Sequence, residues 1–200
     1  NLGVNADSLA TWLLAYLQDF LLKEKILLNL TLDDQAHTHE LLFSGLVNAC
    51  ISAEVKAMKG CESHYLGTMT YKMMANRAFI QRYFSKGLHR DVLRHVPAVI
   101  FNRKAHLHAD FLQEHFGLMQ GSYPCHFIPS SQDFVHLIAR GLGYGFIPEW
   151  QIKNNTAELI DLMPNHHLKV PLYWHCWKQQ PDYLKRMMMH LLNINDVILN

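Results

Sequence analysis

The chain has 200 residues, of which half are hydrophobic and 18% are charged. This composition excludes a disordered chain and suffices for one large domain or two smaller lobes with a buried core. The formal net charge is only +1, so we expect no surface that binds nucleic acid by neutralising phosphates. No apolar run reaches the roughly 18–20 residues that a membrane-spanning helix needs, and no secretory signal pattern is present.

The first fifty residues alternate between predicted strands and helices. Period-two spacing predicts strands at residues 2–4, 26–32 and 47–52, and helical spacing predicts helices from Asp7 or Ser8 to about Leu22 and from about Ala36 to Ser44. A β-α-β-α-β order is typical of a doubly wound parallel sheet.

The same alternation restarts after a longer strand predicted at residues 65–75. Further strands are predicted at 97–101, 123–128 and 169–177 and just after Gly141–Gly145, with helices at 77–83, 91–95, 107–116 and 131–140 and from Pro181 onward. We therefore predict an α/β protein with two Rossmann-like lobes joined by crossing strands. Lobe I comprises residues 1–75 and 170–200, lobe II comprises residues 76–169, and the ligand cleft lies at the carboxyl ends of the strands.

Two strand-to-helix junctions carry small polar residues, Asn5-Ala6-Asp7-Ser8 and Pro129-Ser130-Ser131-Gln132-Asp133. The free N–H groups and the positive dipole end of a helix attract an anion such as an amino-acid carboxylate. The alternative is simple N-capping, which these residue types provide in any protein. Two such junctions in an architecture that directs both at one cleft favour a binding role for at least one.

The other candidate motifs point away from an enzyme, a cofactor or a metal. Gly141–Gly145 follows a helix and lacks the dinucleotide-binding spacing. The 14 histidines show no metal-ligand spacing, and no nucleophile elbow is present. Three of the four cysteines lie in apolar strand-like runs, which indicates reduced thiols in a cytoplasmic protein.

The opening run Val4-Asn5-Ala6-Asp7-Ser8-Leu9-Ala10-Thr11-Trp12-Leu13-Leu14 resembles the effector-binding domain of LysR-type transcriptional regulators, in particular their arginine- and lysine-responsive branch. Weaker matches follow in order along the whole chain, among them Pro124-Cys125-His126, Ile147-Pro148 and Leu172-Tyr173-Trp174-His175. The resemblance implies a lobe arrangement like that of type II periplasmic binding proteins.

The resemblance also implies partners that lie outside this chain. A winged helix-turn-helix upstream of Asn1 would contact DNA, which explains the near-neutral charge. The effector domains would form a homodimer, with residues 8–22 and 26–32 against residues 131–140 of a second copy, and the intact protein would be a tetramer. A small-molecule effector, an amino acid such as arginine or lysine, would shift the population between two arrangements.

Carried over residue by residue, the resemblance places the effector among side chains from both lobes. Lobe I contributes Asn5, Ala6, Asp7, Ser8, Asp34 and Ser52, and lobe II contributes Phe101, Asn102, Ser130, Ser131 and Pro148. For a basic amino acid, Asp7 or Asp34 would pair with the ammonium group, and the serine-capped helix ends would hold the carboxylate.

One segment departs from the branch. Asn102-Arg103-Lys104-Ala105-His106 stands where the branch has an acidic stretch, and cations that face the cleft would repel a basic ligand. A periplasmic-type solute-binding protein for amino-acid transport is the alternative, because it shares the two-lobe fold. An enzyme without a visible catalytic constellation is a third.

Overall fold

The computed structural model describes residues 1–34, 37–102, 106–154 and 158–196. The chain forms two compact units, residues 1–70 with 169–200 and residues 71–168. None of the helices in these described ranges has the length and apolarity needed to cross a bilayer. Each unit combines strands with helices, and one long strand, β4 (Cys61–Asn76), takes part in the sheet pairing of both units.

The sheet of the first unit has the order β2-β1-β3-β9-β4. Strands β1 (Leu2–Val4), β2 (Leu30–Leu32) and β3 (Ala49–Ser52) are parallel, and β9 (Leu168–Trp177) runs antiparallel to β3. The long strand β4 (Cys61–Asn76) carries the chain out of this unit, and β9 returns it. The parallel part confirms the β-α-β-α-β order predicted for the first fifty residues.

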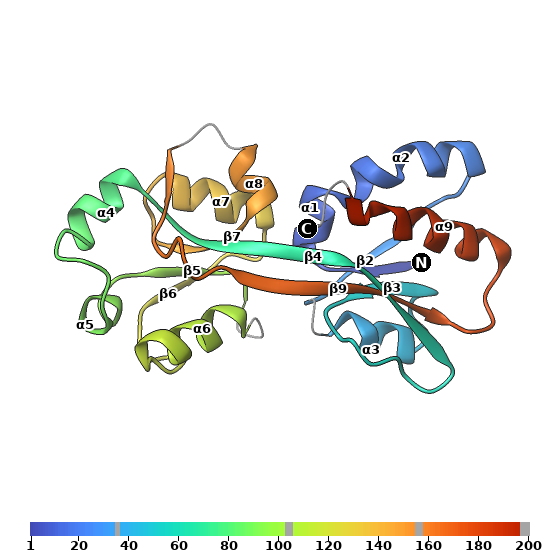
Figure 1. Cartoon of the computed structure of the whole chain (residues 1–200), viewed down its shortest axis with the longest axis horizontal. Helices are drawn as coiled ribbons and strands as arrows, with labels where there is room; N and C mark the ends of the chain where they lie inside the picture. The colour runs from blue at the N-terminus through green and yellow to red at the C-terminus, as the bar shows by residue number, and fades with distance from the viewer. Residues whose placement is uncertain (35–36, 103–105, 155–157, 197–200) are drawn as a thin grey trace. The chain divides into compact units, whose positions relative to one another are not determined.

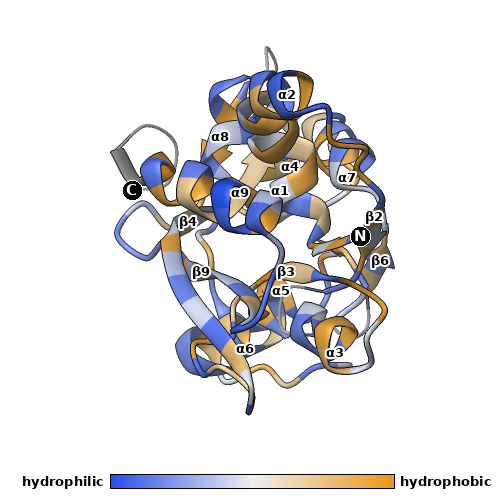
Figure 2. Cartoon of the chain, turned by 90° about the vertical axis from the view of Figure 1, so that its right-hand side faces the viewer, coloured by the Kyte–Doolittle hydropathy of each residue, from blue (hydrophilic) through white to orange (hydrophobic). Residues whose placement is uncertain are grey.

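Helices cover both faces of this sheet. They are α1 (Ala6–Thr11), α2 (Leu13–Glu24), α3 (Thr38–Phe43) and α9 (Asp182–Leu192), which a 3₁₀ turn at Asn193–Asp196 follows. Helices α2 and α9 lie on one face and α3 on the other (Figure 1). The Tyr16 hydroxyl donates to the His190 carbonyl at 3.1 Å, which joins α2 to α9. Hydrophilic and hydrophobic residues alternate around the turns of both helices (Figure 2), as expected for amphipathic helices on a sheet.

The second unit places the distal part of β4 between β7 (Gly145–Pro148) and β8 (Leu159–Asp161), both antiparallel to it. A parallel pair, β5 (Ala98–Ile100) and β6 (Cys125–Phe127), follows, and a bridge from Ala98 to Tyr144 connects β5 to the start of β7. The helices are α4 (Arg77–Tyr83), α5 (Arg90–Leu93), α6 (Leu107–Phe116), α7 (Ser131–Ala139) and α8 (Glu149–Lys153). Helices α6 and α7 lie on opposite sides of the strands (Figure 1).

Several predicted boundaries were wrong. The strand predicted at residues 26–32 is a strand only at Leu30–Leu32, because β1 pairs from Leu2 opposite Leu30 and its bonding reaches back only to the Asn29 carbonyl, which accepts the Leu2 N–H at 2.8 Å. The helix predicted up to Leu22 is two helices that meet at Trp12, a 1% exposed side chain packed into the core. Strand β4 begins at Cys61, before the start predicted at residue 65.

The two predicted caps had different outcomes. Ser130 caps α7, since its hydroxyl accepts the Asp133 N–H at 3.3 Å. Neither Asp7 nor Ser8 caps α1. The N-cap position belongs to Asn5, whose side chain makes no capping hydrogen bond.

The glycines at Gly141–Gly145 are required by packing. A Cβ on Gly143 would lie 2.6 Å from the Pro97 carbonyl oxygen, and one on Gly145 would lie 2.8 Å from the Val99 carbonyl oxygen. Glycine therefore permits the backbone that enters β7 to approach β5 closely. This segment is the turn between α7 and β7, as the order of elements predicted.

Candidate functional site

Three parallel strands of the first unit end at one edge of its sheet. The register pairs Val4 with Leu32 and Gly3 with Cys50, so the residues after β1, β2 and β3 emerge side by side. These residues are Asn5, Asp33 with Asp34, and Ser52. The structure thus brings together the lobe I residues that the sequence singled out, at the edge where ligands bind in open α/β sheets.

Asn5 stands out at this edge. Its side chain is 3% exposed, and its Oδ1 atom has no hydrogen-bond partner within the described residues. A buried carbonyl oxygen without a partner costs roughly 1–3 kcal/mol, so such groups call for an explanation. A ligand with an N–H donor, such as an ammonium or guanidinium group, would supply the missing hydrogen bond.

The next three residues form the first turn of α1 and differ in accessibility. Ala6 and Asp7 are half-buried. The Asp7 backbone carbonyl accepts a hydrogen bond from the Thr11 hydroxyl at 2.6 Å. Ser8 is fully buried, and its hydroxyl faces the Met69 sulfur at 3.8 Å.

The segment after β2 is ordered by local hydrogen bonds. The Asp33 carboxylate accepts the Asp34 backbone N–H at 2.8 Å. His37 Nδ1 lies 3.7 Å from the Asp34 carboxylate, whose side chain is 12% exposed. Asp34 is thus a mostly buried carboxylate at the same edge as Asn5.

Ser52 completes the edge from β3. It is fully buried, and its hydroxyl accepts the Glu54 N–H at 3.1 Å. The hydroxyl of Thr38, at the start of α3, donates to the Ile51 carbonyl at 2.6 Å. Sequence reasoning missed Thr38, since a threonine at a helix start is common and only the tertiary fold brings it to Ile51.

The second unit has a comparable edge at the ends of β5 and β6. Ile100 pairs with Phe127, so Phe101 and Asn102, both half-buried, emerge beside the segment that leads to Ser130. Ser130 Oγ also donates to the Asp133 carboxylate at 2.7 Å. The predicted residues Arg103 and Lys104 lie outside the described residues.

Ser131 is buried at the start of α7 and contacts the Gln151 carboxamide from α8, with its Oγ 3.2 Å from Nε2 and 3.4 Å from Oε1. Gln151 is itself buried, and no sequence signal marked it. The predicted site residue Pro148 ends β7 and precedes α8 directly.

Helix α8 is fixed to β4 by an ion pair in which Lys72 Nζ lies 3.0 Å from Glu149 Oε1. The hydrogen bond from Lys72 holds the pKa of the Glu149 carboxyl below its ordinary value. The ion pair therefore joins β4 to α8, the helix that carries Gln151.

The first unit also holds a group of potential metal-ligating side chains, and the cysteines are reduced. All four cysteines are free thiols, and three are buried. Elsewhere in the first unit, Glu62, His64 and Cys176 place three potential metal-ligating atoms within 4.8 Å of one another.

Comparison with known proteins identifies the family of this chain. It is 40% identical to the HTH-type transcriptional regulator ArgP of Aeromonas salmonicida, over 96% of this chain and 65% of that protein. The C-terminal domains of a LysR family protein from Agrobacterium tumefaciens superpose with a TM-score of 0.92 at 32% identity, covering all of this chain and 97% of theirs. This chain belongs to the LysR family of transcriptional regulators. The relationship confirms the family predicted from the opening run and, with it, the fold like that of type II periplasmic binding proteins.

A third LysR-family relative is informative about ligands. The full-length regulator LysG of Corynebacterium glutamicum, solved with bound effector arginine, matches with a TM-score of 0.84 at 29% identity, over 96% of this chain and 66% of LysG. No known family profile matches the chain. The chain spans about two thirds of the length of its ArgP relatives.

Proposed function

We propose that this chain is the effector-sensing domain of a LysR-type transcriptional regulator and that its effector is a basic amino acid, arginine or lysine. The observation that carries the proposal is the similarity to LysG with bound arginine, together with the ArgP name of the curated relatives. These relatives favour regulation over the alternative of solute transport, because each named one is a regulator.

The proposed site in the first unit is the edge formed by Asn5, Asp34 and Ser52. The unpartnered Asn5 Oδ1 would accept an N–H from the ligand. Asp34 and Asp7 would pair with its cationic groups, and a carboxylate beneath a cation adds a charge-assisted hydrogen bond. Ala6, Ser8 and Ser52 form the surrounding wall.

In the second unit, we propose a place for a carboxylate at the start of α7. The N-terminus of α7, at Ser130 and Ser131, is the positive end of the helix dipole and is a favourable place for the α-carboxylate. Phe101, Asn102 and Pro148 are the other proposed effector-binding residues of the second unit.

We further propose that effector binding acts on DNA through parts of the protein outside this chain. A ligand shifts an equilibrium only by its differential affinity for the two states. An N-terminal helix-turn-helix would therefore respond to arginine through the arrangement of the effector domains. We also propose a cytoplasmic location, because a reducing compartment suits the four free thiols.

A homodimer is proposed to transmit that change. Strand β2 is the outermost strand in the sheet of the first unit, and Leu22, Leu27 and Leu32 are 70%, 98% and 55% exposed on α2, in the α2–β2 connection and on β2. An exposed edge strand with large apolar side chains is a surface that association would cover. Helix α7 of a second copy is the proposed partner of this surface.

Calorimetric titration of this chain with L-arginine, L-lysine, L-citrulline and L-norleucine tests the effector class. Citrulline and norleucine match the two basic amino acids in size and lack the positive charge. We expect binding of arginine or lysine and at least a tenfold weaker response to the neutral counterparts. Absence of binding by both basic amino acids would exclude this effector class and leave the family unchanged.

A further inference from the structure

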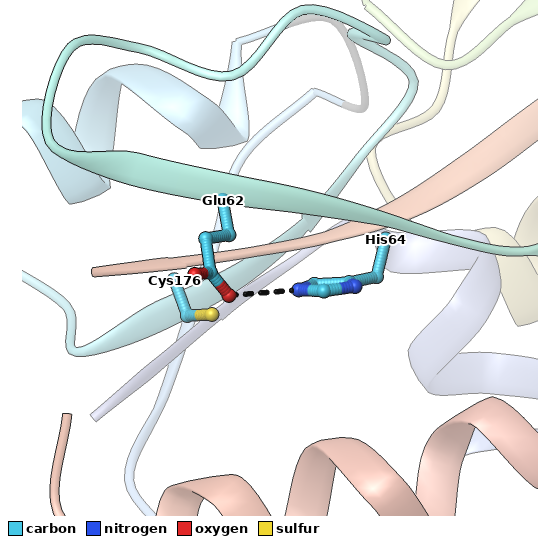
Figure 3. Close-up of side chains that lie close together, drawn as sticks. All are labelled: Glu62, His64 and Cys176. Carbon is cyan, nitrogen blue, oxygen red and sulfur yellow. Dashed lines mark hydrogen bonds and ion pairs between the residues drawn. The ribbon is translucent and has the colours of Figure 1, made fainter. Parts of the chain in front are cut away.

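Three side chains with metal-ligating atoms meet on one face of the first unit's sheet. Glu62 and His64 are two residues apart on β4 and therefore share a face, and Cys176 lies on the adjacent strand β9. One donor atom from each lies within 4.8 Å of the other two (Figure 3). The three donors form a compact cluster of carboxylate, imidazole and thiol.

The alternate residues of the same two strands make their contacts on the other face of the sheet. The alternate residues Ser63 and His175 contact each other, with Ser63 Oγ 3.5 Å from His175 Nε2, and the rings of Tyr65 and Tyr173 lie 5.5 Å apart. These contacts occupy the opposite face. Strand pleating thus separates the Glu62–His64–Cys176 cluster from them.

The spacing of the donors suits a tetrahedral cation. His64 Nε2 lies 3.1 Å from Glu62 Oε2. Zinc bonds of about 2.0–2.2 Å to nitrogen and oxygen at tetrahedral angles place those two donors about 3.4 Å apart. To bind a zinc ion, His64 Nε2 and Glu62 Oε2 need only move slightly farther apart than 3.1 Å. The alternative is an ion pair without a metal, which the same distance also permits.

Gln180 supplies a second, independent observation. Its Nε2 donates to Cys176 Sγ at 3.2 Å, while its Oε1 is buried and has no partner within the described residues. A half-turn of the carboxamide exchanges the two atoms and brings Oε1 beside the sulfur. Donors to one tetrahedral zinc from sulfur and oxygen lie about 3.6 Å apart, so Gln180 is placed to give the fourth ligand.

We propose that Glu62, His64 and Cys176, with Gln180 as the fourth ligand, form a binding site for a divalent d-block cation of the Zn²⁺ class. A thiolate with an imidazole selects such ions over Mg²⁺ and Ca²⁺, which prefer oxygen donors alone. Because β4 carries the chain out of the first unit and β9 returns it, the cation would tie these two strands together. The site is separate from the proposed effector site.

Binding must release a proton. Burial raises the pKa of the Cys176 thiol, so the free protein holds that proton at neutral pH. The cation takes the thiolate as ligand, and the proton passes to solvent. Affinity is therefore expected to rise with pH.

The test is titration of the metal-stripped chain with Zn²⁺ and with Co²⁺. We expect one tight equivalent of Zn²⁺, proton release measured from calorimetry in two buffers, and a thiolate-to-cobalt charge-transfer band. Cys176→Ser should abolish the band and weaken Zn²⁺ binding at least about tenfold. Cys125→Ser, which alters a thiol in the second unit, is the matched control and should change neither.

Two further variants separate this site from surface binding by the 14 histidines. His64→Gln should lose the tight equivalent, and Gln180→Glu should tighten it by adding an anionic ligand. Circular dichroism of each variant establishes that it is folded. Zinc binding that is unchanged in Cys176→Ser and His64→Gln, or the absence of a tight equivalent in the unmodified chain, would overturn the proposal.

Discussion

The Thr38 hydroxyl donates to the Ile51 carbonyl at 2.6 Å, in the buried interior beneath the edge that carries Asn5, Asp34 and Ser52. This hydrogen bond joins the first residue of α3 to β3. It satisfies a carbonyl at the end of the strand and fixes the residue that follows it, Ser52. The Thr38 hydroxyl therefore helps to position two candidate ligand-binding segments, the one that precedes α3 and the one that follows β3.

Thr38→Val should destabilise the chain by about 1–3 kcal/mol, because the isosteric methyl leaves the buried Ile51 carbonyl without its donor. Chemical denaturation measures the loss. Thr68→Val is the control, since the Thr68 hydroxyl contacts Tyr65 in an exposed pair and its removal should cost little. Equal effects of the two substitutions would show that the bond to Ile51 has no special weight.

Asn5→Ala should weaken binding of the basic amino acid about tenfold or more, in line with the roughly 1.5–3 kcal/mol of a hydrogen bond to a charged group. The same substitution should cost little stability, because the Asn5 side chain neither caps α1 nor pairs its Oδ1. Calorimetry gives the affinity. Asn193→Ala, on an exposed residue after α9, should bind like the parent, and an unaltered affinity in Asn5→Ala would move the site elsewhere.

Ser131 and Gln151 should be energetically coupled. Each single change, Ser131→Ala or Gln151→Leu, leaves one buried polar group without its partner and should cost about 1–3 kcal/mol. The double variant removes both groups and should be more stable than the sum of the single losses indicates. A double-mutant cycle from denaturation curves measures this coupling. Strict additivity would mean that the two side chains do not interact.

The order of the strands and helices, and the edge that carries Asn5, could be predicted from the sequence because both depend on residues that are close together along the chain. The opening strand, Asn5 and the following helix are adjacent in sequence, and parallel strands that alternate with helices must end on one edge. The Ser130 cap was likewise predictable, because a serine before a helix acts through an N–H three residues away.

The features that could not be predicted depend on contacts between residues that lie far apart in the sequence. No helix-breaking residue marks the break at Trp12, whose side chain is buried in the core. Gln151 and Thr38 have partners that only the fold brings near. Cys176 lies more than a hundred residues from His64, so a search for ligands at short spacing found no metal site, although three donors converge in space.

Leu27→Lys should disrupt the proposed homodimer, since Leu27 is 98% exposed in the single chain and the proposed interface would bury the added charge. Light scattering coupled to size exclusion measures the mass. Val55→Lys introduces the same charge at a residue that is 61% exposed away from β2 and should leave the mass unchanged. If Leu27→Lys keeps the mass of the parent dimer, the interface lies elsewhere.

His108 makes stability depend on pH. The imidazole is buried among the rings of Tyr123, Tyr144 and Phe146, with centroids 5.4–5.7 Å away, and neither ring nitrogen has a partner within the described residues. Burial lowers the pKa of His108 from the ordinary histidine value of 6.5 to about 3. The native state therefore keeps His108 neutral at pH values where the unfolded chain protonates it.

The direction of this pH dependence follows from the linkage between proton binding and folding. Between pH 6.5 and about 3 the unfolded chain binds one more proton at this residue than the native state does, so stability falls as pH falls, by at most about 1.4 kcal/mol per pH unit from this group. His108→Phe fills the same aromatic surroundings without a titrating group. Urea unfolding at pH 7.5, 6 and 5 should show a smaller loss for His108→Phe than for the parent, whereas the exposed control His89→Phe should retain the parent's slope. Identical pH dependence in the parent and in His108→Phe would show that His108 is not the residue responsible.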